Sequence, residues 1–348
     1  MSFQRPLTHT ILLHAWTRRG VLAWALLPVA CLFGALSAVR RALYRHGRLP
    51  SSHLPVPVIV VGNIFVGGTG KTPLTIWLVA QLRAAGYTPG VISRGYGRRH
   101  GGSQTVDADA LPGEVGDEPL LIAHRAQCPV VVGRNRVDAA RALLAAHPAV
   151  NVIVSDDGLQ HYALQRDIEI VLFDARYIGN GWLLPAGPLR ESAARARDFT
   201  VVNAAQLPPN APADAVRMQL VGDRAESLGD RSRCVTLASL ATTPPGLSPV
   251  RIVAAAGIGN PARFFTLLRT FGLAFRELPL PDHYDFADNP FAGLDADVIL
   301  MTEKDAVKCS RIASLAQDPR LWVVPVAAHI DAALAEKIVE KLRGHPTA

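Results

Sequence analysis

Cysteine is scarce in this chain: its 348 residues include four cysteines, and no two of them form a C-x-x-C pair. Such spacing predicts neither a disulfide framework nor a structural zinc site. We therefore interpret the four as reduced packing residues of a cytosolic chain. Internal repeats and low-complexity tracts are lacking as well, so we expect no repeat architecture.

Charged side chains are also few, at 19% of the residues against 49% hydrophobic ones, and this balance excludes global disorder. The length is that of two domains, or of one large domain with an appendage. The net charge is +7. This excess favours a partner that carries phosphate, namely a nucleotide, a nucleic acid or an anionic membrane surface, without selecting among them.

The N-terminal region contains a run without charge, VLAWALLPVACLFGALSAV at 21–39. As a helix it would be about 28 Å long, just short of a ~30 Å hydrocarbon core. Pro28, Gly34 and Ser37 weaken it further as a membrane span. Basic clusters on both sides suit a helix that lies among lipid headgroups, which is the interpretation we favour over a single span or a buried core helix. The flanking residues are Arg18, Arg19, Arg40, Arg41, Arg45 and Arg48.

The segment from Gly62 to Pro73, GNIFVGGTGKTP, carries the strongest functional signal. It follows the β-branched run 58–61 and leads into residues 74–82, whose apolar spacing predicts a helix. A strand, a glycine-rich turn and Gly-Lys-Thr at a helix start are the context of a phosphate-binding loop. The sequence therefore predicts a nucleoside-triphosphate site.

The residues of this loop have distinct expected roles. Its backbone N–H groups converge on phosphate oxygens, helped by the partial positive charge of the helix start. Lys71 is expected to reach the terminal phosphates, and the Thr72 hydroxyl to bind Mg²⁺. Phe65 and Val66 depart from the commonest loops, which have a glycine or a lysine there. The expected nucleotide-contacting residues are Gly67, Gly68, Thr69, Gly70, Lys71 and Thr72.

Strands that alternate with helices follow the loop and predict a P-loop NTPase-type parallel sheet with helices on both faces. We interpret the proline-rich stretch 207–249 as a junction to a second, smaller α/β unit. The expected segments are 1–50 (apolar and basic), 51–240 (P-loop domain) and 241–348 (smaller α/β domain). The expected strands are 58–61, 88–93, 129–133, 151–155, 168–173, 250–256, 298–301 and 321–326, and the expected helices 74–82, 117–127, 135–147, 261–271 and 331–342.

Aspartates follow two of the expected strands. Phosphoryl transfer needs a metal-organising carboxylate besides the P-loop threonine. Asp156 and Asp157 end one strand as a pair and suit Mg²⁺, which prefers oxygen ligands. Asp174 ends the next strand and is the less favoured candidate. A helix cap or a turn is the alternative for each of them.

Two further motifs are weaker. Gly257-Ile258-Gly259 lacks the third glycine of a dinucleotide fingerprint, so we interpret it as a tight turn. Thr302-Glu303-Lys304-Asp305 resembles the guanine-reading motif, but its lysine comes one position too late, which speaks against a GTPase. His283 lies in a polar loop, where a solvated side chain is the more common outcome.

Arginines gather in the loops beyond the expected strand ends. Ligands of α/β sheets bind at these carboxyl ends, and arginine pairs there with phosphate or carboxylate in a bidentate fashion. Solvent-facing charge is the alternative for each one. The candidates are Arg94, Arg98, Arg134, Arg136 and Arg190.

Several segments together resemble the tetraacyldisaccharide 4′-kinases of lipid A synthesis. They occur in the family's order between about residues 57 and 308, after an apolar N-terminal helix like the family's own. Phe65 is the departure from the pattern. The matching segments are GNIFVGGTGKTP, ISRGYGR, GDEP, VGRNR, SDDGLQH, LPAGPLRE, DHYDF and TEKDAVK.

The resemblance implies a kinase that transfers the ATP γ-phosphate to the 4′-hydroxyl of a tetraacyl glucosamine disaccharide 1-phosphate. It implies ATP and Mg²⁺ as cofactors, no nucleic-acid partner, and a position at the cytoplasmic face of the inner membrane, through a peripheral or single-span N-terminal anchor. Two α/β units would close over the nucleotide.

The resemblance also implies roles for single residues. Asp117 of GDEP resembles the catalytic base that takes the proton of the sugar hydroxyl. His283 resembles its supporting partner or a part of the nucleotide site. Asp156 and Asp157 resemble the Mg²⁺-organising pair. The residues expected to meet the acceptor headgroup are Arg94, Arg134, Arg136, Arg190 and Glu191.

Three other functions compete with this one. A membrane-recruited P-loop ATPase would act as a switch and release phosphate to water. A GTP-binding transport or insertion factor is a second alternative, against which the register of Lys304 speaks. A kinase of a small soluble acceptor, with the N-terminal helix buried in its core, is the third.

Overall fold

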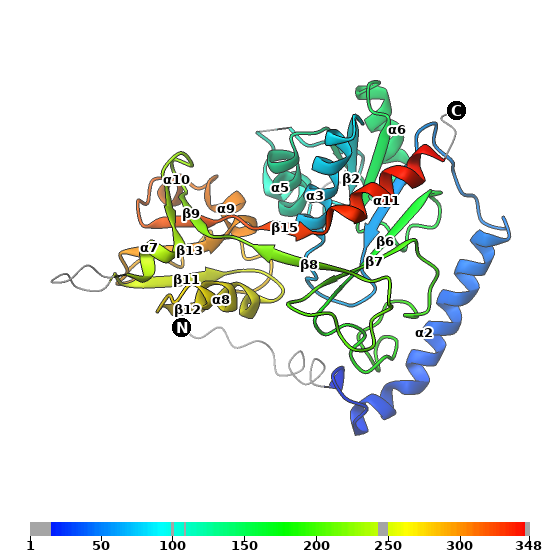
Figure 1. Ribbon diagram of the computed structural model, residues 1–348, viewed down its shortest axis with the longest axis horizontal. Helices are drawn as coiled ribbons and strands as arrows, with labels where there is room; N and C mark the ends of the chain where they lie inside the picture. Colours follow the sequence, from blue (N-terminus) through cyan, green and yellow to red (C-terminus); the bar gives the residue numbers. More distant parts are fainter. Residues whose placement is uncertain (1–14, 99–100, 108, 243–249, 345–348) are drawn as a thin grey trace.

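The computed structural model describes residues 15–98, 101–107, 109–242 and 250–344. It contains two α/β units and a long N-terminal helix along the outer edge of the first (Figure 1). The predicted fold class is thereby confirmed. Residues 1–14 of the predicted N-terminal segment, 243–249 of the predicted junction and 345–348 lie outside the described residues.

The first unit contains a nine-stranded sheet in the order β15-β8-β7-β6-β1-β5-β2-β4-β3. Its strands are parallel except at the two edges, where β15 and β3 pair antiparallel to their neighbours. Its strands are β1 (Val58–Gly62), β2 (Pro89–Ser93), β3 (Gln104–Thr105), β4 (Val130–Val132), β5 (Val152–Asp156), β6 (Ile168–Asp174), β7 (Phe199–Asn203), β8 (Val216–Val221) and β15 (Ala327–Ile330).

Helices cover both faces of this sheet because its strands are buried on both sides. Successive residues of β1 show this: Ile59 and Val61 pack into one hydrophobic cluster, and Val58 and Val60 into another on the opposite face. Helices α3, α5 and α11 contribute to the first cluster and α6 to the second. The helices are α3 (Lys71–Ala84), α4 (Pro112–Val115), α5 (Asp117–Ala126), α6 (Arg136–Ala146) and α11 (Ala332–Arg343).

The second unit contains a six-stranded sheet in the order β10-β9-β14-β13-β11-β12. The strands β14, β13, β11 and β12 are parallel. Its strands are β9 (Arg224–Ser227), β10 (Cys234–Thr236), β11 (Ile252–Ala256), β12 (Arg276–Pro279), β13 (Val298–Thr302) and β14 (Leu321–Val324), and its helices α7 (Leu237–Ala241), α8 (Pro261–Thr270), α9 (Glu303–Cys309) and α10 (Ala313–Ala316).

Sheet membership departs from the predicted segments in two places. Strands β9 and β10, from the stretch interpreted as a junction, pair in the second sheet. Strand β15 returns to the first sheet, and α11 packs there against α3. Strands as short as these have little periodicity of their own, and the pairing partner decides their sheet. The limits at 50/51 and 240/241 as domain boundaries stay a prediction.

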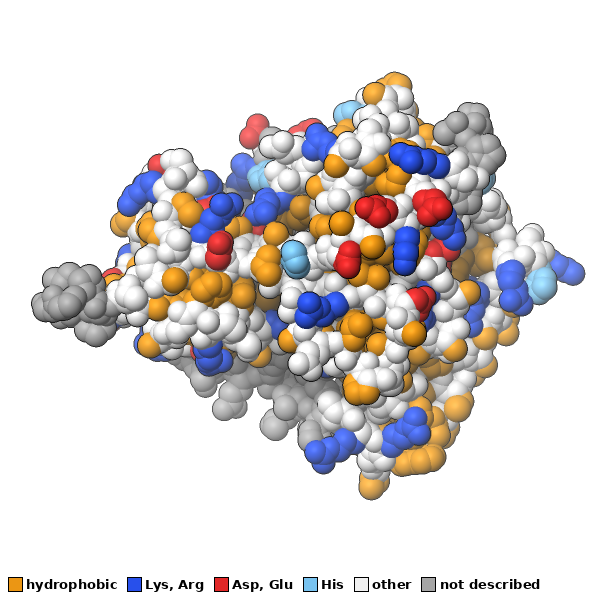
Figure 2. Space-filling view, viewed as in Figure 1, with side chains coloured by type: hydrophobic (Ala, Val, Ile, Leu, Met, Phe, Trp, Pro, Cys, Tyr) orange, Lys and Arg blue, Asp and Glu red, His pale blue; other side chains and the backbone are white. Residues whose placement is uncertain are grey.

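The N-terminal helix α2 (Val21–Arg45) is one continuous helix of 25 residues that includes Pro28. By length and composition alone it could cross a membrane. One side contacts the first unit, where Ala23 and Ala30 are buried. Hydrophobic side chains gather along the edge that this helix forms (Figure 2). The other side is an apolar stripe spaced by three or four residues: Val29, Leu32, Leu36, Val39 and Leu43.

Candidate active site between the two units

A cavity of about 1060 Å³ lies where the carboxyl ends of strands from both sheets meet. Lining residues come from the P-loop after β1, from the end of β5, from the turn after β11 and from the start of α9. The turn after β11 touches the P-loop, since a Cβ added to Gly259 would lie 3.4 Å from the Gly68 amide nitrogen. Thus the tight turn predicted at 257–259 forms part of the site.

The P-loop has the backbone shape that a phosphate cradle requires. Gly67 and Gly70 have φ angles of +110° and +101°, which side-chain-bearing residues rarely adopt. A Cβ on Gly70 would also lie 2.5 Å from Asn203 Nδ2. A Cβ on Gly68 would meet nothing within 4 Å, so this glycine faces open space. The geometry fits a phosphate group held by backbone amides.

Two asparagines that the sequence did not single out hold this loop in place. Asn63 Nδ2 donates hydrogen bonds to the carbonyls of Phe65 (2.7 Å) and Gly67 (3.1 Å). Asn203, at the end of β7, donates to the Thr69 carbonyl at 2.9 Å. Thr69 itself is fully buried behind the loop and does not line the cavity. The loop is therefore preformed by side chains rather than shaped by a ligand.

Lys71 begins α3 and points along the loop. Its Nζ donates to Asn63 Oδ1 at 3.3 Å and lies 3.6 Å from Asp157 Oδ1. Lys71 and Thr72 both line the cavity. The structure thus brings the predicted phosphate-binding lysine beside the predicted metal-organising pair.

The paired aspartates occupy different environments. Asp156 is buried and accepts hydrogen bonds from Ser93 Oγ (3.1 Å) and Thr75 Oγ1 (3.4 Å). Burial raises its pKa to about 6, helped by the charges of Glu118 and Asp157. For Asp157 burial acts in the same direction, but Lys71 and Arg190 hold its pKa below the usual value. Asp157 is therefore the permanently charged member of the pair.

The residues around Asp157 fit a magnesium ion. Its Oδ1 is buried and has no hydrogen-bond partner within the described part of the chain. Lys71 Nζ lies 3.6 Å from this oxygen, and a carboxylate oxygen is the kind of ligand that Mg²⁺ prefers. Thr72 lines the same cavity and offers a hydroxyl. Among the described residues, no group of three or more His, Cys, Asp and Glu side chains is arranged to hold a metal ion, so a metal here would depend on phosphate oxygens and water for its remaining ligands.

Asp117 begins α5 on the side of the cavity that faces the second unit. It is buried, and its Oδ2 lies 3.0 Å from His283 Nδ1, which donates because a carboxylate only accepts. Burial by itself would raise the pKa of Asp117. The hydrogen bond from His283 and the charges of Lys304 and Lys308 outweigh burial and lower this pKa to about 2. Asp117 is consequently a carboxylate at neutral pH.

His283 is held from two sides. Its backbone has a φ of +61°, an uncommon value for a residue with a side chain. Its ring packs against Tyr96 of the first unit, with the ring centroids 5.2 Å apart. The hydrogen bond with Asp117 raises the pKa of His283, against the opposing effect of burial. The predicted pairing of Asp117 with His283 is therefore present in the structure.

The predicted acceptor-binding residues fall into two groups. Arg94 and Arg190 line the cavity, and Arg190 Nη1 lies 3.6 Å from Asp157 Oδ2. Arg134 is exposed and, among the described residues, does not belong to the cavity lining. The structure thus brings two of the four predicted arginines to the site directly.

Arg136 and Glu191 are buried in hydrogen-bonded positions outside the cavity lining that the described residues form. Arg136 donates to the carbonyls of Gly133 (2.7 Å) and Asp156 (3.3 Å), so it supports the strand end that carries the aspartate pair. Glu191 accepts from Gln160 at 2.8 Å and pairs with Arg195 and Arg41. Both residues are placed to support neighbouring segments rather than to contact an acceptor directly.

The departure at Phe65 has a structural partner. The Arg176 guanidinium lies 4.2 Å from the centroid of the Phe65 ring and forms an ion pair of 2.6 Å with Asp174. This stacking buries the aromatic ring at the start of the loop. Asp174, the less favoured metal candidate, is thereby occupied by Arg176.

The TEKD segment has a structural role. Thr302 caps α9, and Asp305 Oδ2 accepts from the Gly257 amide (2.9 Å) and from Thr302 Oγ1 (2.7 Å). Asp305 therefore fixes the turn that lies against the P-loop. Arg263 of α8 also reaches the P-loop and donates to the Thr69 carbonyl at 3.3 Å. Arg263 could not be singled out from the sequence, because only the fold brings α8 to the loop.

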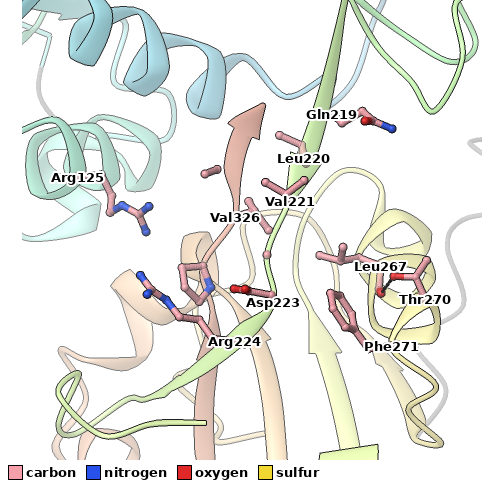
Figure 3. A pocket seen from close by; sticks show the side chains of 13 residues that line it. Arg125, Gln219, Leu220, Val221, Asp223, Arg224, Leu267, Thr270, Phe271 and Val326 are labelled. Atoms are coloured by element: carbon pink, nitrogen blue, oxygen red, sulfur yellow. Dashed lines mark hydrogen bonds between the residues drawn. The ribbon is translucent and has the colours of Figure 1, made fainter. Parts of the chain in front are cut away.

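A smaller cavity of about 490 Å³ adjoins the first where the chain crosses between the units. Arg125 and Arg224 extend from one side of it, and Leu267 and Phe271 face them from the end of α8 (Figure 3). None of the predicted site residues lines it. The larger cavity is therefore the candidate active site.

Comparisons with known proteins agree with this geometry. The family model described as tetraacyldisaccharide-1-P 4'-kinase matches residues 22–343. The tetraacyldisaccharide 4'-kinase of Janthinobacterium sp. (strain Marseille) is 64% identical over 348 residues, covering all of both chains. That of Herminiimonas arsenicoxydans is 60% identical and covers 100% of this chain and 99% of its own.

A solved structure is also similar. The crystal structure of LpxK from Aquifex aeolicus in complex with ATP superposes with a TM-score of 0.75 at 28% identity. The match covers 92% of this chain and 100% of that one. Family match, full-length relatives and shared fold lead to one conclusion: the chain belongs to the tetraacyldisaccharide-1-P 4'-kinase family.

Proposed function

We propose that this protein transfers the γ-phosphoryl group of ATP to the 4′-hydroxyl of a tetraacyl disaccharide 1-phosphate. The observation that carries the proposal is the shared cavity: a preformed P-loop lies on one side and the Asp117–His283 pair on the other. Phosphoryl transfer needs phosphate positioning together with an acceptor for the hydroxyl proton. A switch ATPase transfers phosphate to water, so it needs no side chain that accepts the proton of a sugar hydroxyl.

On the nucleotide side, the P-loop amides and Lys71 bind and orient the phosphates. Asn63 and Asn203 keep the loop in shape, so little reorganisation accompanies binding. Thr72 and Asp157 would hold Mg²⁺, which neutralises phosphate charge when bound. Asp156, buried behind its neighbour, receives hydrogen bonds from two hydroxyls and fixes the end of β5.

On the acceptor side, Asp117 receives the proton of the sugar hydroxyl. Its carboxylate stays charged at neutral pH, as the lowered pKa requires. His283 orients it and, with Tyr96 against its ring, is itself fixed. Arg94 and Arg190 provide positive charge for the phosphate of the acceptor.

The direct test incubates detergent-solubilised protein with γ-labelled ATP, Mg²⁺ and a tetraacyl disaccharide 1-phosphate. The product should carry the label as a second phosphate on the lipid, at the 4′ position. Lys71→Ala serves as the inactive control and Lys337→Ala, at an exposed lysine of α11, as the matched active one. Label released only as inorganic phosphate would contradict the kinase and favour the switch.

We further propose that α2 lies flat on the cytoplasmic face of the inner membrane. Both ends of the helix are tied to the first unit. Near its start the rings of Trp24 and Trp182 pack edge to face at 4.9 Å, and near its end Arg41 pairs with Glu191. A helix held at both ends along a folded unit presents its apolar stripe to a membrane surface without spanning it.

Vesicle binding tests the membrane proposal. Leu32 and Leu36 are about three-fifths exposed, at 61% and 62%, and each buried leucine contributes about 1.5–3 kcal/mol. The variant Leu32→Glu/Leu36→Glu should therefore bind anionic vesicles at least about tenfold more weakly, with ATP binding unchanged. Leu207→Glu, exposed outside α2, is the matched control. Equal vesicle binding by wild type, the double variant and the control would show that the apolar stripe of α2 does not bind the membrane.

A further inference from the structure

Two lysines of α9 reach Asp117 from the second unit. Lys304 Nζ lies 3.8 Å and Lys308 Nζ 3.7 Å from Asp117 Oδ2. They are four positions apart in sequence, so they lie on the same face of the helix. Both reach the carboxylate oxygen that also contacts His283. The proposed mechanism above assigns these lysines no role.

Lys308 is unusual for a lysine. It is 9% exposed, and its ammonium group has no hydrogen-bond partner within the described residues. A buried charge in this state is costly unless opposite charges lie nearby. Asp305 Oδ1 lies 3.7 Å away, and its other oxygen is already held by Gly257 and Thr302. Lys308 therefore lies between one carboxylate fixed within the second unit and one that belongs to the first.

Lys304 is the more accessible of the two. Its Nζ lies 3.1 Å from Glu118 Oε1 and 3.4 Å from Asp282 Oδ1. Although burial lowers the pKa of Lys304, these carboxylates and Asp117 raise it above the usual value. Lys304 is therefore a permanent cation at the site. The charged groups around Asp117 are Glu118 on its own helix, Lys304, Asp305 and Lys308 on α9, and Asp282 and His283 on the preceding loop.

We propose that Lys304 and Lys308 are positioning residues, which keep the buried Asp117 carboxylate charged and so make its action as proton acceptor depend on the docked second unit. The inference rests on the proposed function, since it assumes that Asp117 receives the hydroxyl proton. Neither lysine needs to touch the nucleotide or the acceptor for this role.

The physical reason is the balance between burial and charge at Asp117. Burial disfavours the ionised carboxyl and raises its pKa, whereas His283 and the two lysines lower it to about 2. With the lysine charges removed, the effect of burial on the pKa of Asp117 is opposed by fewer positive charges, and this pKa rises. The carboxyl then takes up a proton at a higher pH, and a protonated carboxyl cannot accept the proton of a hydroxyl.

The test follows kcat/KM for the lipid acceptor between pH 5 and 8. We compare wild type with Lys304→Met, Lys308→Met and the double variant. Methionine keeps the length of the side chain without its charge. Wild type should show no acid limb from Asp117 in this range. The double variant should show one above pH 5, which corresponds to an upward displacement of about three pH units from the value of about 2. Each single variant should show a smaller displacement. Lys337→Met, at an exposed lysine far from Asp117 in sequence, should match wild type.

A further variant distinguishes a shift of the pH profile from a loss of folding stability. Lys308→Met/Asp305→Asn removes the lysine together with the carboxylate that it balances in the second unit. Asparagine can still accept from Gly257 and Thr302. This variant should melt near wild type and retain the displaced acid limb. ATP binding of all soluble variants should stay within about twofold of wild type, because the P-loop is unchanged.

The outcomes distinguish the inference from the function on which it rests. Profiles of the methionine variants that coincide with wild type, together with an inactive Asp117→Asn, would overturn the lysine roles and leave the base assignment intact. Full activity of Asp117→Asn would overturn the base assignment itself. A displaced limb in the methionine variants, with Asp117→Asn inactive, supports both.

Discussion

The two walls of the active-site cavity are built in different ways. The P-loop wall, residues 63–72, is one continuous segment whose shape is fixed by asparagine side chains and by glycine backbone. The opposite wall is formed by Asp117, His283 and Lys304, with Lys308 contacting Asp117 from outside the cavity lining. It comes from three segments and is crowded with opposite charges. The first wall is built within one unit and receives a contact from Arg263 of the other, whereas the second wall exists only when the units are docked.

This difference suggests a division of labour. A preformed wall keeps its converging amides in any arrangement of the units, and the contact from Arg263 adds to phosphate binding when the units are docked. A wall assembled from charges of two units becomes competent only in one arrangement. Phosphate binding and proton acceptance should therefore respond to different substitutions.

The largest expected effect comes from Asp117→Asn. The amide cannot accept the hydroxyl proton, so kcat should fall by about 10²–10⁴. The measurement is single-turnover transfer of label from ATP to the lipid. Asp138→Asn, in the first turn of α6, is the control at an acidic residue outside the cavity lining. Transfer at a rate within a few-fold of wild type would contradict the proposed role of Asp117 in the opposite wall.

A large effect is also expected from Lys71→Ala. Removing the cation beside the phosphates should lower kcat by about 10²–10³ and weaken ATP binding as well. Steady-state kinetics over a range of ATP concentrations separates the two quantities. The melting temperature should change little, because Lys71 Nζ has two polar partners among the described residues, Asn63 and Asp157. A variant with normal KM for ATP and normal kcat would contradict the assignment of residues 63–72 as the phosphate-binding loop.

A moderate effect is expected from Arg263→Met. Its hydrogen bond to the Thr69 carbonyl connects α8 of the second unit with the P-loop, and a charged hydrogen bond contributes about 1.5–3 kcal/mol. KM for ATP should rise roughly tenfold, with kcat less affected. Arg269→Met, exposed on the same helix, is the matched control. No change in KM would mean that the P-loop wall is independent of the second unit.

The smallest effect concerns stability. The pKa of His283 is raised in the folded protein, so the pair with Asp117 stabilises fully below the unfolded pKa of about 6.5 and loses this contribution as pH rises through the folded pKa. His283→Ala should therefore destabilise by up to about 1 kcal/mol near pH 6, and by less near pH 9. Denaturant unfolding at both pH values measures this. His329→Ala, exposed in β15, should show no such trend.

How far the sequence predicts this site depends on the wall. The P-loop wall is contiguous, and its residues 67–72 were predicted one by one, whereas the supporting Asn63 was not. The Asp156–Asp157 pair follows from its place at a strand end. The pairing of Asp117 with His283 came from family resemblance alone, since 166 positions separate them. Geometry then confirmed that the two are in contact.

The rest could not be predicted because it depends on tertiary contacts. Lys304 and Lys308 both lie in the family-like segment TEKDAVK. The sequence assigned a role to neither, since Lys304 was interpreted as a misplaced guanine-reading residue and a lysine on a short helix is usually solvated. Arg136 resembled an acceptor contact, yet it is buried and donates to backbone carbonyls. Short strands such as β9, β10 and β15 take their sheet from their partners.

The most direct measurement is a titration of ATP, with Mg²⁺, into Asp117→Asn and Lys71→Ala side by side. The account predicts that Asp117→Asn binds ATP like wild type although it transfers no phosphate, and that Lys71→Ala binds it more weakly. If Asp117→Asn lost ATP binding to the same degree as Lys71→Ala, Asp117 would belong to the nucleotide site, and the separation of the two walls would be contradicted.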